Sequence, residues 1–472
     1  MYVQQLFTGC LSEMAYYIES NGEAAIIDPL RETTPYTNMA NERNAKIKYI
    51  FLTHFHADFV SGHLDLAKKT GATIVFGPNA KTAFDIQHGK DEEIFNLGTI
   101  KIKLLHTPGH TMESSSYLLI DQEGKTPYVF TGDTLFIGDV GRPDLAVKSD
   151  LTEADLASHL FDSLRNKIMS LPDETIVYPA HGAGSACGKN MSKETYDTIG
   201  HQKETNYALR ADMTREEFIE EVTTGLVTPP QYFPKNVAMN KGINKSYDDI
   251  LSKGNIPLSV DEFKTIHKKE NALIMDVRHE SNFVKGHING SLFFGLDESF
   301  APWVGTLIED LNTPILLITP KGREEETITR LTRVGYDNVK GFLKGGVEAW
   351  KAAGENTEII DSISAKTFAE ELDKNSGAVL DVRKESEFYA EHIIADDVTN
   401  SSLDNLTTNY TQLDKNKTHY THCAGGYRSV IAIAILKAKG YDKLINVEGG
   451  FNKIKEYSIV QTSPYICPTT ML

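Results

Sequence analysis

The chain has 472 residues, of which 24% are charged and 40% are hydrophobic, and its formal net charge is −17. This length exceeds what a single hydrophobic core usually supports and predicts about three domains. The acidic residues are spread along the chain, which argues against nucleic acid or an anionic membrane as a partner. We find no leader pattern and no apolar run near the roughly 18 residues of a membrane span. Four cysteines in so long a chain favour a reducing, cytoplasmic environment over a disulfide framework.

Short strand patterns alternate with turns over residues 1 to about 200. Residues 63–69 read as a helix that Gly71 ends, and residues 216–222 as another helix, followed by an extended linker at 229–234. This order suits two sheets packed face to face with helices outside, an αββα sandwich. The strands expected from the pattern are 24–29, 50–53, 73–76 and 100–104.

The chain repeats itself beyond residue 257. Three landmarks recur 105 residues later and a fourth recurs 104 residues later. Each copy alternates strand and helix patterns over about 100 residues, which predicts two small α/β domains with mostly parallel sheets. We expect domains at 1–245 (with 201–245 as extension and linker), 246–357 and 358–472. The paired landmarks are Asp276-Val277-Arg278 with Asp381-Val382-Arg383, His287-Ile288 with His392-Ile393, Gly335-Tyr336-Asp337 with Gly440-Tyr441-Asp442, and Lys344-Gly345-Gly346 with Glu448-Gly449-Gly450.

Histidine and aspartate side chains follow several apolar strand patterns or tight turns of the first domain. Strand ends are rigid and can aim such side chains into one cleft. A single histidine would more often be an ordinary surface or core residue, but several at strand ends predict a metal site. The candidates are His54, His56, Asp58, His110, Asp133 and His181.

The segment Thr53-His54-Phe55-His56-Ala57-Asp58-Phe59 resembles the HxHxDH signature of the metallo-β-lactamase superfamily, whose hydrolases hold two metal ions. In those hydrolases the final histidine belongs to the second metal, and Phe59 stands in its place. The resemblance narrows to the persulfide dioxygenases, which implies one Fe(II) per chain with open positions for a thiolate and O2. It implies His54, His110 and Asp133 as ligands, with His56, Asp58 and His181 orienting those ligands and hydrogen-bonding bound water.

Four more side chains are candidates in this domain. In the dioxygenase branch a Gly-Arg-x-Asp stretch lies beside the iron, which implies that Arg142 helps bind an anionic substrate while Asp144 fixes its guanidinium; an ordinary buried Arg–Asp pair is the alternative. Tyr178 could donate to a metal-bound oxygen species or simply be a buried, hydrogen-bonded tyrosine. Cys187 lies in a glycine-rich loop near Lys189. It is either a thiol of lowered pKa that receives sulfane sulfur or an inert buried cysteine.

The second copy contains Thr421-His422-Cys423-Ala424-Gly425-Gly426-Tyr427-Arg428-Ser429 before an apolar helix at 430–436. Two glycines let backbone N–H groups turn toward the sulfur, and the helix N-terminus and Arg428 add positive charge. These features favour a thiolate or persulfide on Cys423. The loop resembles the active-site loop of rhodanese sulfurtransferases, which implies that Ala424, Gly425, Gly426, Tyr427 and Ser429 form the cradle. Protein tyrosine phosphatases also place Arg after Cys, but with a longer spacing and a wider cradle.

The first copy lacks this loop. Projected back by 105 residues, Cys423 corresponds to Ile318, and Pro320 removes an N–H group from the corresponding cradle. We therefore expect residues 246–357 to be a rhodanese-like domain without its own chemistry, acting as a structural spacer or a docking surface.

Together the resemblances imply a persulfide dioxygenase–rhodanese fusion of the kind used in sulfide detoxification. The first domain would oxidise a low-molecular-weight persulfide with O2 to sulfite, and Cys423 would carry sulfane sulfur that feeds the iron site or reaches sulfite as thiosulfate. One alternative is a thioester hydrolase similar to hydroxyacylglutathione hydrolase, with two zinc ions. Another is a sulfur carrier or sensor whose metal domain is not catalytic. The carrier thiol, the direction of sulfur flow and the oligomeric state stay open, although a homo-oligomer is expected.

Overall fold

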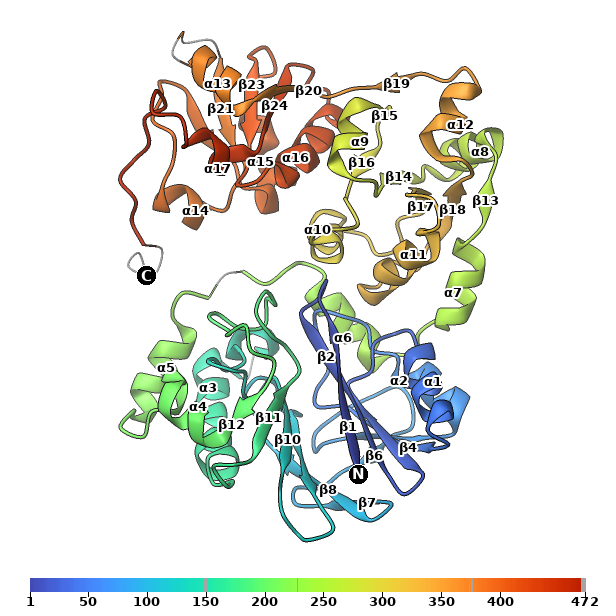
Figure 1. Ribbon diagram of the computed structural model, residues 1–472, viewed down its shortest axis with the longest axis vertical. Helices are drawn as coiled ribbons and strands as arrows, with labels where there is room; N and C mark the ends of the chain where they lie inside the picture. Colours follow the sequence, from blue (N-terminus) through green and yellow to red (C-terminus); the bar gives the residue numbers. More distant parts are fainter. Residues whose placement is uncertain (148–150, 227, 373, 375–376, 468–472) are drawn as a thin grey trace. The chain divides into compact units, whose positions relative to one another are not determined.

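The computed structural model describes residues 1–147, 151–226, 228–372, 374 and 377–467 (Figure 1). The chain divides into two compact units, residues 1–249 with 332–335, and residues 250–331 with 336–472. Within the described residues, none of the helices has both the length and the apolar character needed to cross a membrane.

Two six-stranded sheets form the centre of the first unit. They pack face to face, since one core cluster joins Tyr16 and Phe51 of one sheet to Leu104, Tyr117 and Phe130 of the other. The first sheet has the order β1 (Tyr2–Thr8), β2 (Glu13–Ser20), β3 (Glu23–Ile27), β4 (Lys46–Phe51), β5 (Thr73–Phe76) and β6 (Gln87–His88). The second has the order β12 (Asp197–Thr198), β11 (Ile176–Pro179), β10 (Tyr128–Gly132), β9 (Ser115–Ile120), β8 (Ile100–His106) and β7 (Ile94–Leu97).

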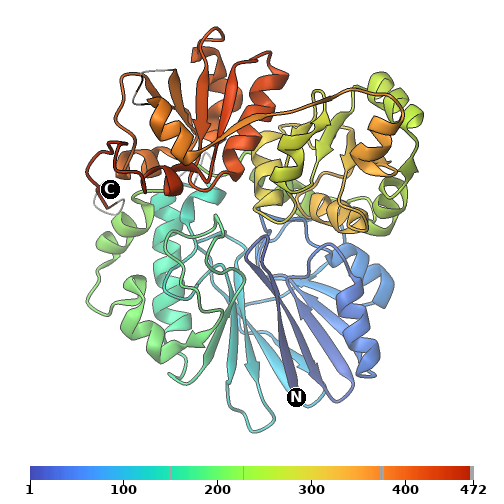
Figure 2. The same ribbon diagram turned by 45° about the horizontal axis from the view of Figure 1, so that its top comes forward.

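Helices cover the outer face of each sheet (Figure 2). On the first sheet, α1 (Thr34–Glu42) and α2 (His63–Thr70) pack through Tyr36 and Leu66. On the second, α3 (Glu153–Ser163) and α5 (Arg215–Thr223) pack through side chains such as Leu160 and Phe218. This is the predicted αββα sandwich. The unit also contains α4 (Ile199–Thr205), α6 (Phe233–Lys241) and the start of α7 (Tyr247–Gly254).

The predicted strands of this domain are all present, with ends that differ by up to four residues. The predicted helix at 63–69 is α2, and Gly71 ends it with a left-handed φ of 73°. The extended linker predicted at 229–234 is wrong at its end, because α6 begins at Phe233. Pro234 lies in the first turn of this helix, where its missing N–H group has no intrahelical partner to lose.

The second unit contains two five-stranded sheets of the same design. Every strand pair in both sheets is parallel. The first sheet has the order β13 (Pro257–Leu258), β18 (Val339–Leu343), β17 (Ile315–Ile318), β14 (Leu273–Asp276) and β16 (Leu292–Phe293). The second has the order β20 (Asp361–Ser364), β24 (Leu444–Glu448), β23 (His419–His422), β21 (Ala378–Asp381) and β22 (Val398–Asn400).

Helices connect these parallel strands, as the crossover in a parallel sheet requires. The first copy contains α8 (Val260–Glu270), α9 (Glu280–Lys285), α10 (Phe300–Leu307), α11 (Glu324–Arg333) and α12 (Gly346–Ala352). The second contains α13 (Ala365–Leu372), α14 (Glu385–Ala390), α15 (Leu406–Asn409), α16 (Tyr427–Ala438) and α17 (Gly450–Ile454). The short strands β15 (His287–Ile288) and β19 (Thr357–Glu358) pair separately.

The internal duplication extends to individual contacts. Arg278 donates from Nε and Nη2 to Asp276 at 2.9 and 2.6 Å, and Arg383 donates in the same way to Asp381 at 3.0 and 2.6 Å. Each pair anchors the turn that follows the second strand of its domain. The repeated landmark therefore has a structural reason, which is a buried carboxylate that needs a paired cation.

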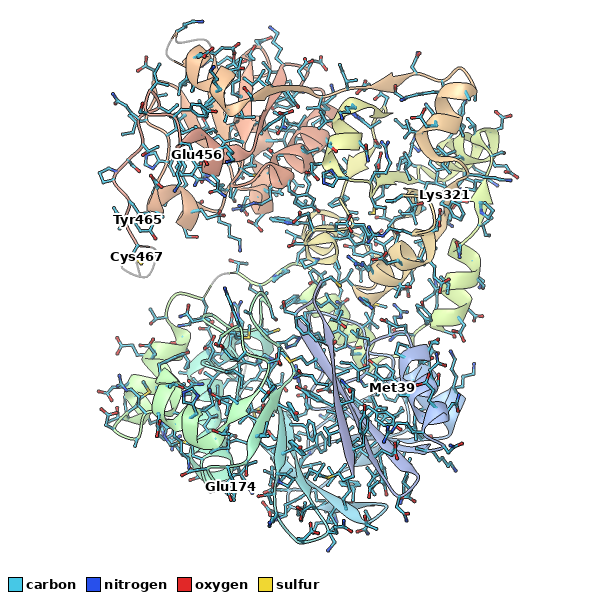
Figure 3. The ribbon with its side chains drawn as sticks, viewed as in Figure 1. Met39, Glu174, Lys321, Glu456, Tyr465 and Cys467 are labelled. Atoms are coloured by element: carbon cyan, nitrogen blue, oxygen red, sulfur yellow. The ribbon has the colours of Figure 1, made fainter. Side chains whose placement is uncertain are left out.

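Strand register corrects the predicted counterpart of Cys423. Asp276 pairs with Ile318 in the first copy, and Asp381 pairs with His422 in the second. Ile318 therefore corresponds to His422, and the residue at the position of Cys423 is Thr319, one residue further along. The segment that follows contains Lys321, whose exposed side chain is labelled in Figure 3.

Candidate metal centre and sulfur-transfer loop

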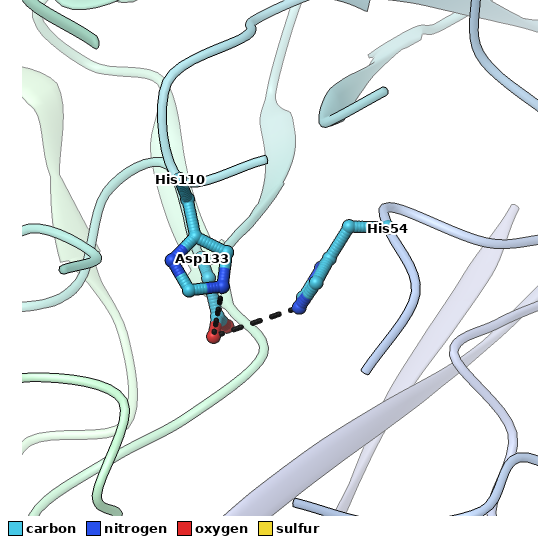
Figure 4. A group of neighbouring side chains, drawn as sticks. All are labelled: His54, His110 and Asp133. Atoms are coloured by element: carbon cyan, nitrogen blue, oxygen red, sulfur yellow. Dashed lines mark ion pairs between the residues drawn. The ribbon is translucent and has the colours of Figure 1, made fainter. Parts of the chain in front are cut away.

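Three side chains from separate segments of the first unit converge in the way the sequence predicts (Figure 4). His54 follows β4, His110 lies on the Pro-Gly turn after β8, and Asp133 follows β10. The Nε2 atoms of His54 and His110 lie 3.7 and 3.5 Å from Asp133 Oδ2. All three side chains are buried, and their ligand atoms lie within 4.8 Å of one another.

Neighbouring groups fix which ring nitrogen carries a hydrogen in the neutral form of both imidazoles. His54 Nδ1 lies 2.9 Å from Thr53 Oγ1, whose own hydrogen goes to Asp28 Oδ2 at 2.7 Å. The imidazole must therefore donate from Nδ1. His110 Nδ1 lies 2.9 Å from the carbonyl oxygen of Arg142, which can only accept. In both rings the lone pair is left on Nε2, which is the tautomer that a metal ion requires.

Asp133 adds a carboxylate oxygen that nothing else satisfies. Its Oδ1 atom accepts a hydrogen bond from His181 Nδ1 at 2.7 Å, whereas buried Oδ2 has no hydrogen-bond partner among the described residues. Burial alone would raise the pKa of Asp133, but His181 and His54 lower it, so the group is a carboxylate. Two imidazole lone pairs and a carboxylate oxygen that face one another in a buried site fit a divalent metal ion.

A second cluster contains His56, Asp58 and His181. His181 Nε2 lies 2.8 Å from Asp58 Oδ2, so this imidazole connects Asp58 to Asp133. Burial would lower the pKa of His181, but the two carboxylates raise it well above the usual value. His56 Nε2 lies 3.1 Å from Asp28 Oδ1. These contacts suit the predicted orienting role, although the three ligand atoms are also close enough to hold a metal ion.

Phe59 stands where the superfamily signature has its last histidine. Its side chain is completely buried, and its ring lies against the imidazole of His56 with ring centroids 4.3 Å apart. An apolar ring therefore fills the place beside the second cluster where a further metal ligand would lie.

Two residues that the sequence pattern does not single out hold the histidine loop, residues 54–59. Asp28 accepts hydrogen bonds from the backbone N–H and the hydroxyl of Thr53 at 2.8 and 2.7 Å. Asn240 of α6 donates to the carbonyl oxygens of His56 and Phe59, both at 2.8 Å, and accepts from the N–H of Ser61. Asp28 closes a strand as the metal ligands do, and this could have drawn attention to it. Nothing in the pattern of α6 distinguishes Asn240.

Arg142 and Asp144 form the predicted pair. The guanidinium donates from Nε and Nη2 to the two carboxylate oxygens at 2.7 and 2.6 Å. Arg142 is 4% exposed, and its backbone also bonds His110 and Cys187. Arg142 therefore connects His110 to the segment around Cys187. Binding of an anionic substrate by Arg142 stays a prediction.

Cys187 lies beside the metal cluster, but its surroundings differ from those predicted. Its Sγ atom is close enough to Asp133 and His181 to share a metal ion with them. Lys189 donates to the carbonyl oxygen of Glu221 at 2.6 Å and not to the sulfur. Burial, together with Asp58 and Asp133, raises the pKa of the Cys187 thiol. Of the two alternatives for Cys187, these surroundings favour the buried cysteine over the thiol of lowered pKa.

Tyr178 lies in an aromatic group that packs between the two sheets. Its ring is stacked on Tyr128 and Phe130, with centroids 5.4 and 5.6 Å apart, and lies 5.1 Å from Tyr16. These ring contacts give Tyr178 a structural role in packing the core. Hydrogen bonding from Tyr178 to a metal-bound oxygen species stays a prediction.

The second candidate site is the loop between β23 and α16. Cys423 follows β23 directly and is almost completely buried. The N–H group of Gly426 donates to its Sγ atom at 3.1 Å, and Ser429 Oγ lies 3.9 Å away. Gly426 has a φ of 112°, which a residue with a side chain rarely adopts, and it caps α16. The predicted cradle of an inward N–H group at a helix N-terminus is therefore present.

Arg428 lies near the loop but has a second partner. Its two terminal nitrogens donate to both carboxylate oxygens of Glu387 at 2.6 and 2.8 Å. This pairing offsets part of the positive charge that the sequence predicts beside the sulfur. Glu387 belongs to α14 and was not among the predicted site residues.

The repeated Gly-Gly segment supports the cysteine loop, residues 423–429, through backbone hydrogen bonds. Phe451 and Asn452 donate their N–H groups to the carbonyl oxygens of Cys423 and Ala424 at 2.7 and 3.0 Å. A Cβ atom on Gly450 would lie 2.4 Å from the Cys423 carbonyl oxygen. The close approach therefore needs glycine at this position.

Comparison with known families matches the metal domain and each of the two repeated domains separately. Residues 8–181 match the metallo-beta-lactamase superfamily, and residues 259–353 and 364–457 each match the rhodanese-like domain. A hydroxyacylglutathione hydrolase of Dictyostelium discoideum is 31% identical over 198 residues, which are 39% of this chain and 70% of that protein. The chain belongs to the metallo-beta-lactamase superfamily and carries two rhodanese-like domains after the metal domain.

Individual relatives cover different parts of the chain. A probable hydroxyacylglutathione hydrolase of Schizosaccharomyces pombe is 34% identical over 33% of this chain, and the match spans 58% of that protein. The crystal structure of a metallo-beta-lactamase from Staphylococcus aureus is 29% identical with a TM-score of 0.64, and it covers 73% of this chain and 98% of its own. ETHE1 from Myxococcus xanthus is 31% identical with a TM-score of 0.44, over 51% of this chain and 98% of its own.

Proposed function

We propose that the protein is an Fe(II)-dependent persulfide dioxygenase joined to a rhodanese sulfurtransferase. The observation that carries this proposal is the ring of Phe59 against His56, where the dinuclear hydrolases have a metal ligand. One complete three-ligand site of two imidazoles and a carboxylate is left, and a cysteine loop suited to sulfane sulfur follows in the same chain. Because the same chain carries this cysteine loop, a sulfur compound is a reasonable substrate for the metal domain.

His54, His110 and Asp133 are the residues that would hold the iron. Fe(II) held by these residues would supply open coordination positions for a persulfide sulfur and for O2. The protein's own groups fix the site, because Thr53 and the Arg142 carbonyl oxygen hold the two imidazoles in the required tautomer. Overall, one persulfide, one O2 and one water give sulfite and the free thiol.

Cys423 would handle the sulfane sulfur. The Gly426 N–H group stabilises negative charge on Sγ or on a sulfur attached to it. When sulfite attacks the outer sulfur of a Cys423 persulfide, the S–S bond breaks and its electron pair stays on Sγ. Thiosulfate leaves and the Cys423 thiolate is regenerated. We propose a low-molecular-weight persulfide, O2, sulfite and thiosulfate as the small-molecule partners, cytoplasmic location, and assembly as a homo-oligomer.

The second candidate function is a dinuclear zinc thioester hydrolase. The observation in its favour is the cluster of His56, Asp58 and His181, whose ligand atoms lie within 4.8 Å of one another. Several relatives of the first domain are named hydroxyacylglutathione hydrolases. This candidate gives the cysteine loop no part in the reaction.

Metal content and O2 uptake of the anaerobically purified chain test the proposal. Fe(II)-loaded protein given glutathione persulfide should consume O2 and form sulfite, with close to one iron per chain. His110→Ala should lose O2 uptake while sulfur transfer by Cys423 stays. Two zinc ions per chain, hydrolysis of S-lactoylglutathione and no O2 uptake with several persulfides would instead establish the hydrolase. If the protein shows neither O2 uptake nor thioester hydrolysis but still transfers sulfur, it would be a sulfur carrier.

A further inference from the structure

The first rhodanese-like domain has no cysteine, yet it lies against the Cys423 loop of the second. Tyr427 of α16 donates from its hydroxyl to the carbonyl oxygen of Gly295 at 3.2 Å. The ring of Tyr427 also contacts that of Phe293, with centroids 5.6 Å apart. These contacts connect the residue four positions after Cys423 to the end of β16. The first domain is therefore part of the surroundings of the loop.

A cavity of about 720 Å³ lies between these two domains at the cysteine loop. Gly425 and Gly426 of the loop form part of its wall, and α9 of the first domain forms another part. A cavity of this size accommodates a small molecule. Gly426 lines this cavity and also donates its N–H group to Cys423 Sγ, so one residue connects the cavity wall to the sulfur.

The charges on the cavity wall indicate the kind of molecule. The wall contains three carboxylates, from Glu280 of α9, Asp361 of β20 and Glu448 of β24, and one ammonium group, from Lys285 of α9. This balance favours a cationic group in the cavity. The anionic sulfur itself meets a different part of the site, where the N–H group and the N-terminus of α16 are positive.

We propose that this cavity is the binding site for a thiol that bears an ammonium group, and that the first rhodanese-like domain supplies part of its specificity through Glu280. The inference rests on the proposed sulfur-transfer function of Cys423. The acceptor thiolate attacks the outer sulfur of the Cys423 persulfide, and the S–S bond breaks. Its electron pair remains on Cys423 Sγ, and the sulfane sulfur leaves on the acceptor as a new persulfide. No oxidant is needed, because one persulfide and one thiolate exchange places.

The test compares three thiols that share a two-carbon spacer and differ only in their end group. These are cysteamine with an ammonium, 2-mercaptoethanol with a hydroxyl and 2-mercaptoethanesulfonate with a sulfonate. The full chain is loaded with sulfur by a low-molecular-weight persulfide without O2, desalted and mixed with each thiol. Loss of sulfur from Cys423 is followed by mass after alkylation, with Cys423→Ser as the blank.

The quantity to compare is the ratio of the cysteamine rate to the sulfonate rate, taken for each variant relative to the wild type. Intrinsic thiol reactivity then cancels. The ratio should fall by about tenfold in the triple variant Glu280→Gln/Asp361→Asn/Glu448→Gln, because each partly exposed pair of charges contributes only a small factor. It should rise in Lys285→Gln, and the wild-type preference should weaken with added salt.

A matched variant separates a local effect from one of net charge. Glu348→Gln/Glu370→Gln/Asp404→Asn removes three carboxylates that are absent from the cavity wall. It should leave the ratio unchanged. An unchanged ratio in the cavity variant, or an equal fall in the matched variant, would overturn the proposal. If the wild type takes up no sulfur at Cys423, the proposed function itself fails; if loading and transfer are normal and only the ratio is unaffected, the cavity assignment alone fails.

Discussion

The phenyl ring of Phe59 lies against the imidazole of His56, with centroids 4.3 Å apart and ring planes inclined by 32°. Phe59 is fully buried, and Asn240 holds its carbonyl oxygen. The ring is therefore an integral part of the metal domain, and it removes one ligand from the second cluster. The proposal of a single metal ion in this domain rests on this contact.

Phe59→His should restore the missing ligand. Metal content measured after loading should rise from near one to near two ions per chain, because imidazole nitrogen is a strong ligand for divalent metals. O2 uptake with persulfide should fall at the same time. Phe161→His, a substitution in α3 away from the cluster, should leave metal content near one. Two metals in the wild-type chain would contradict the assigned role of Phe59.

Asn240→Ala should weaken the histidine loop without touching a ligand. It leaves the carbonyl oxygens of His56 and Phe59 and the N–H of Ser61 without their partner. The expected loss of stability is about 2–3 kcal/mol, and the expected loss of metal affinity is about 10–100-fold. Chemical denaturation and competition with a chelator measure the two effects. The control is Asn244→Ala. Asn244 lies just after α6 and donates one hydrogen bond to the carbonyl oxygen of Met239, so its loss should change the metal affinity little.

Cys423→Ser should separate the two activities. The serine hydroxyl cannot form a persulfide, so thiosulfate production should fall to background while O2 uptake stays within about twofold of the wild type. Oxygen-electrode traces and chromatography of sulfite and thiosulfate provide the readout. Cys467→Ser, at an exposed cysteine near the C-terminus, should leave both activities intact. Full thiosulfate production by Cys423→Ser would exclude the rhodanese role.

Gly450→Ala should impair sulfur transfer through crowding. The added Cβ atom would lie 2.4 Å from the Cys423 carbonyl oxygen, so the loop has to move. The sulfur-transfer rate should fall at least about tenfold, because a displacement of about 1 Å at a reacting group has effects of this order or larger. The repeated domain provides the control at Gly346, which has a similar φ of 59° but nothing within 4 Å of an added Cβ. Gly346→Ala should therefore show only the backbone strain, with normal sulfur transfer.

His63 should make stability depend on pH. Its ring is fully buried, and burial followed by the nearby His56 lowers its pKa to about 3. In the unfolded chain the imidazole of His63 binds a proton as the pH falls below about 6.5, whereas in the folded chain it stays neutral until about pH 3. Stability is therefore lost as the pH falls from about 6.5 toward 3, by up to about 1.4 kcal/mol per pH unit.

The test of this dependence is His63→Phe, whose ring can pack against Phe84 as the imidazole does. Urea unfolding between about pH 4 and pH 7 should show a slope reduced by nearly one proton. His159→Gln, at an exposed histidine of α3, should keep the wild-type slope. An identical slope in His63→Phe would show that the buried imidazole is already protonated in the folded chain.

The local sequence determined the elements and singled out the residues that carry the proposed chemistry. Alternating apolar residues and turn residues predict the strands, and polar residues directly after strands, such as His54, Asp133 and Cys423, predict the ligands and the nucleophile. The repeat of Asp276 as Asp381 revealed the duplication. These signals are readable because each depends on neighbouring residues and on the two periodicities of secondary structure.

Only the tertiary structure decided which groups these residues meet. Strand register moved the counterpart of Cys423 from Ile318 to Thr319, since one residue of shift changes every pairing. Lys189 bonds a backbone carbonyl oxygen and not Cys187, and Arg428 pairs with Glu387. Asn240, far along the chain, holds the histidine loop. Protonation, charge pairing and cavity shape depend on contacts between residues distant in sequence, and local pattern carries no information about those contacts.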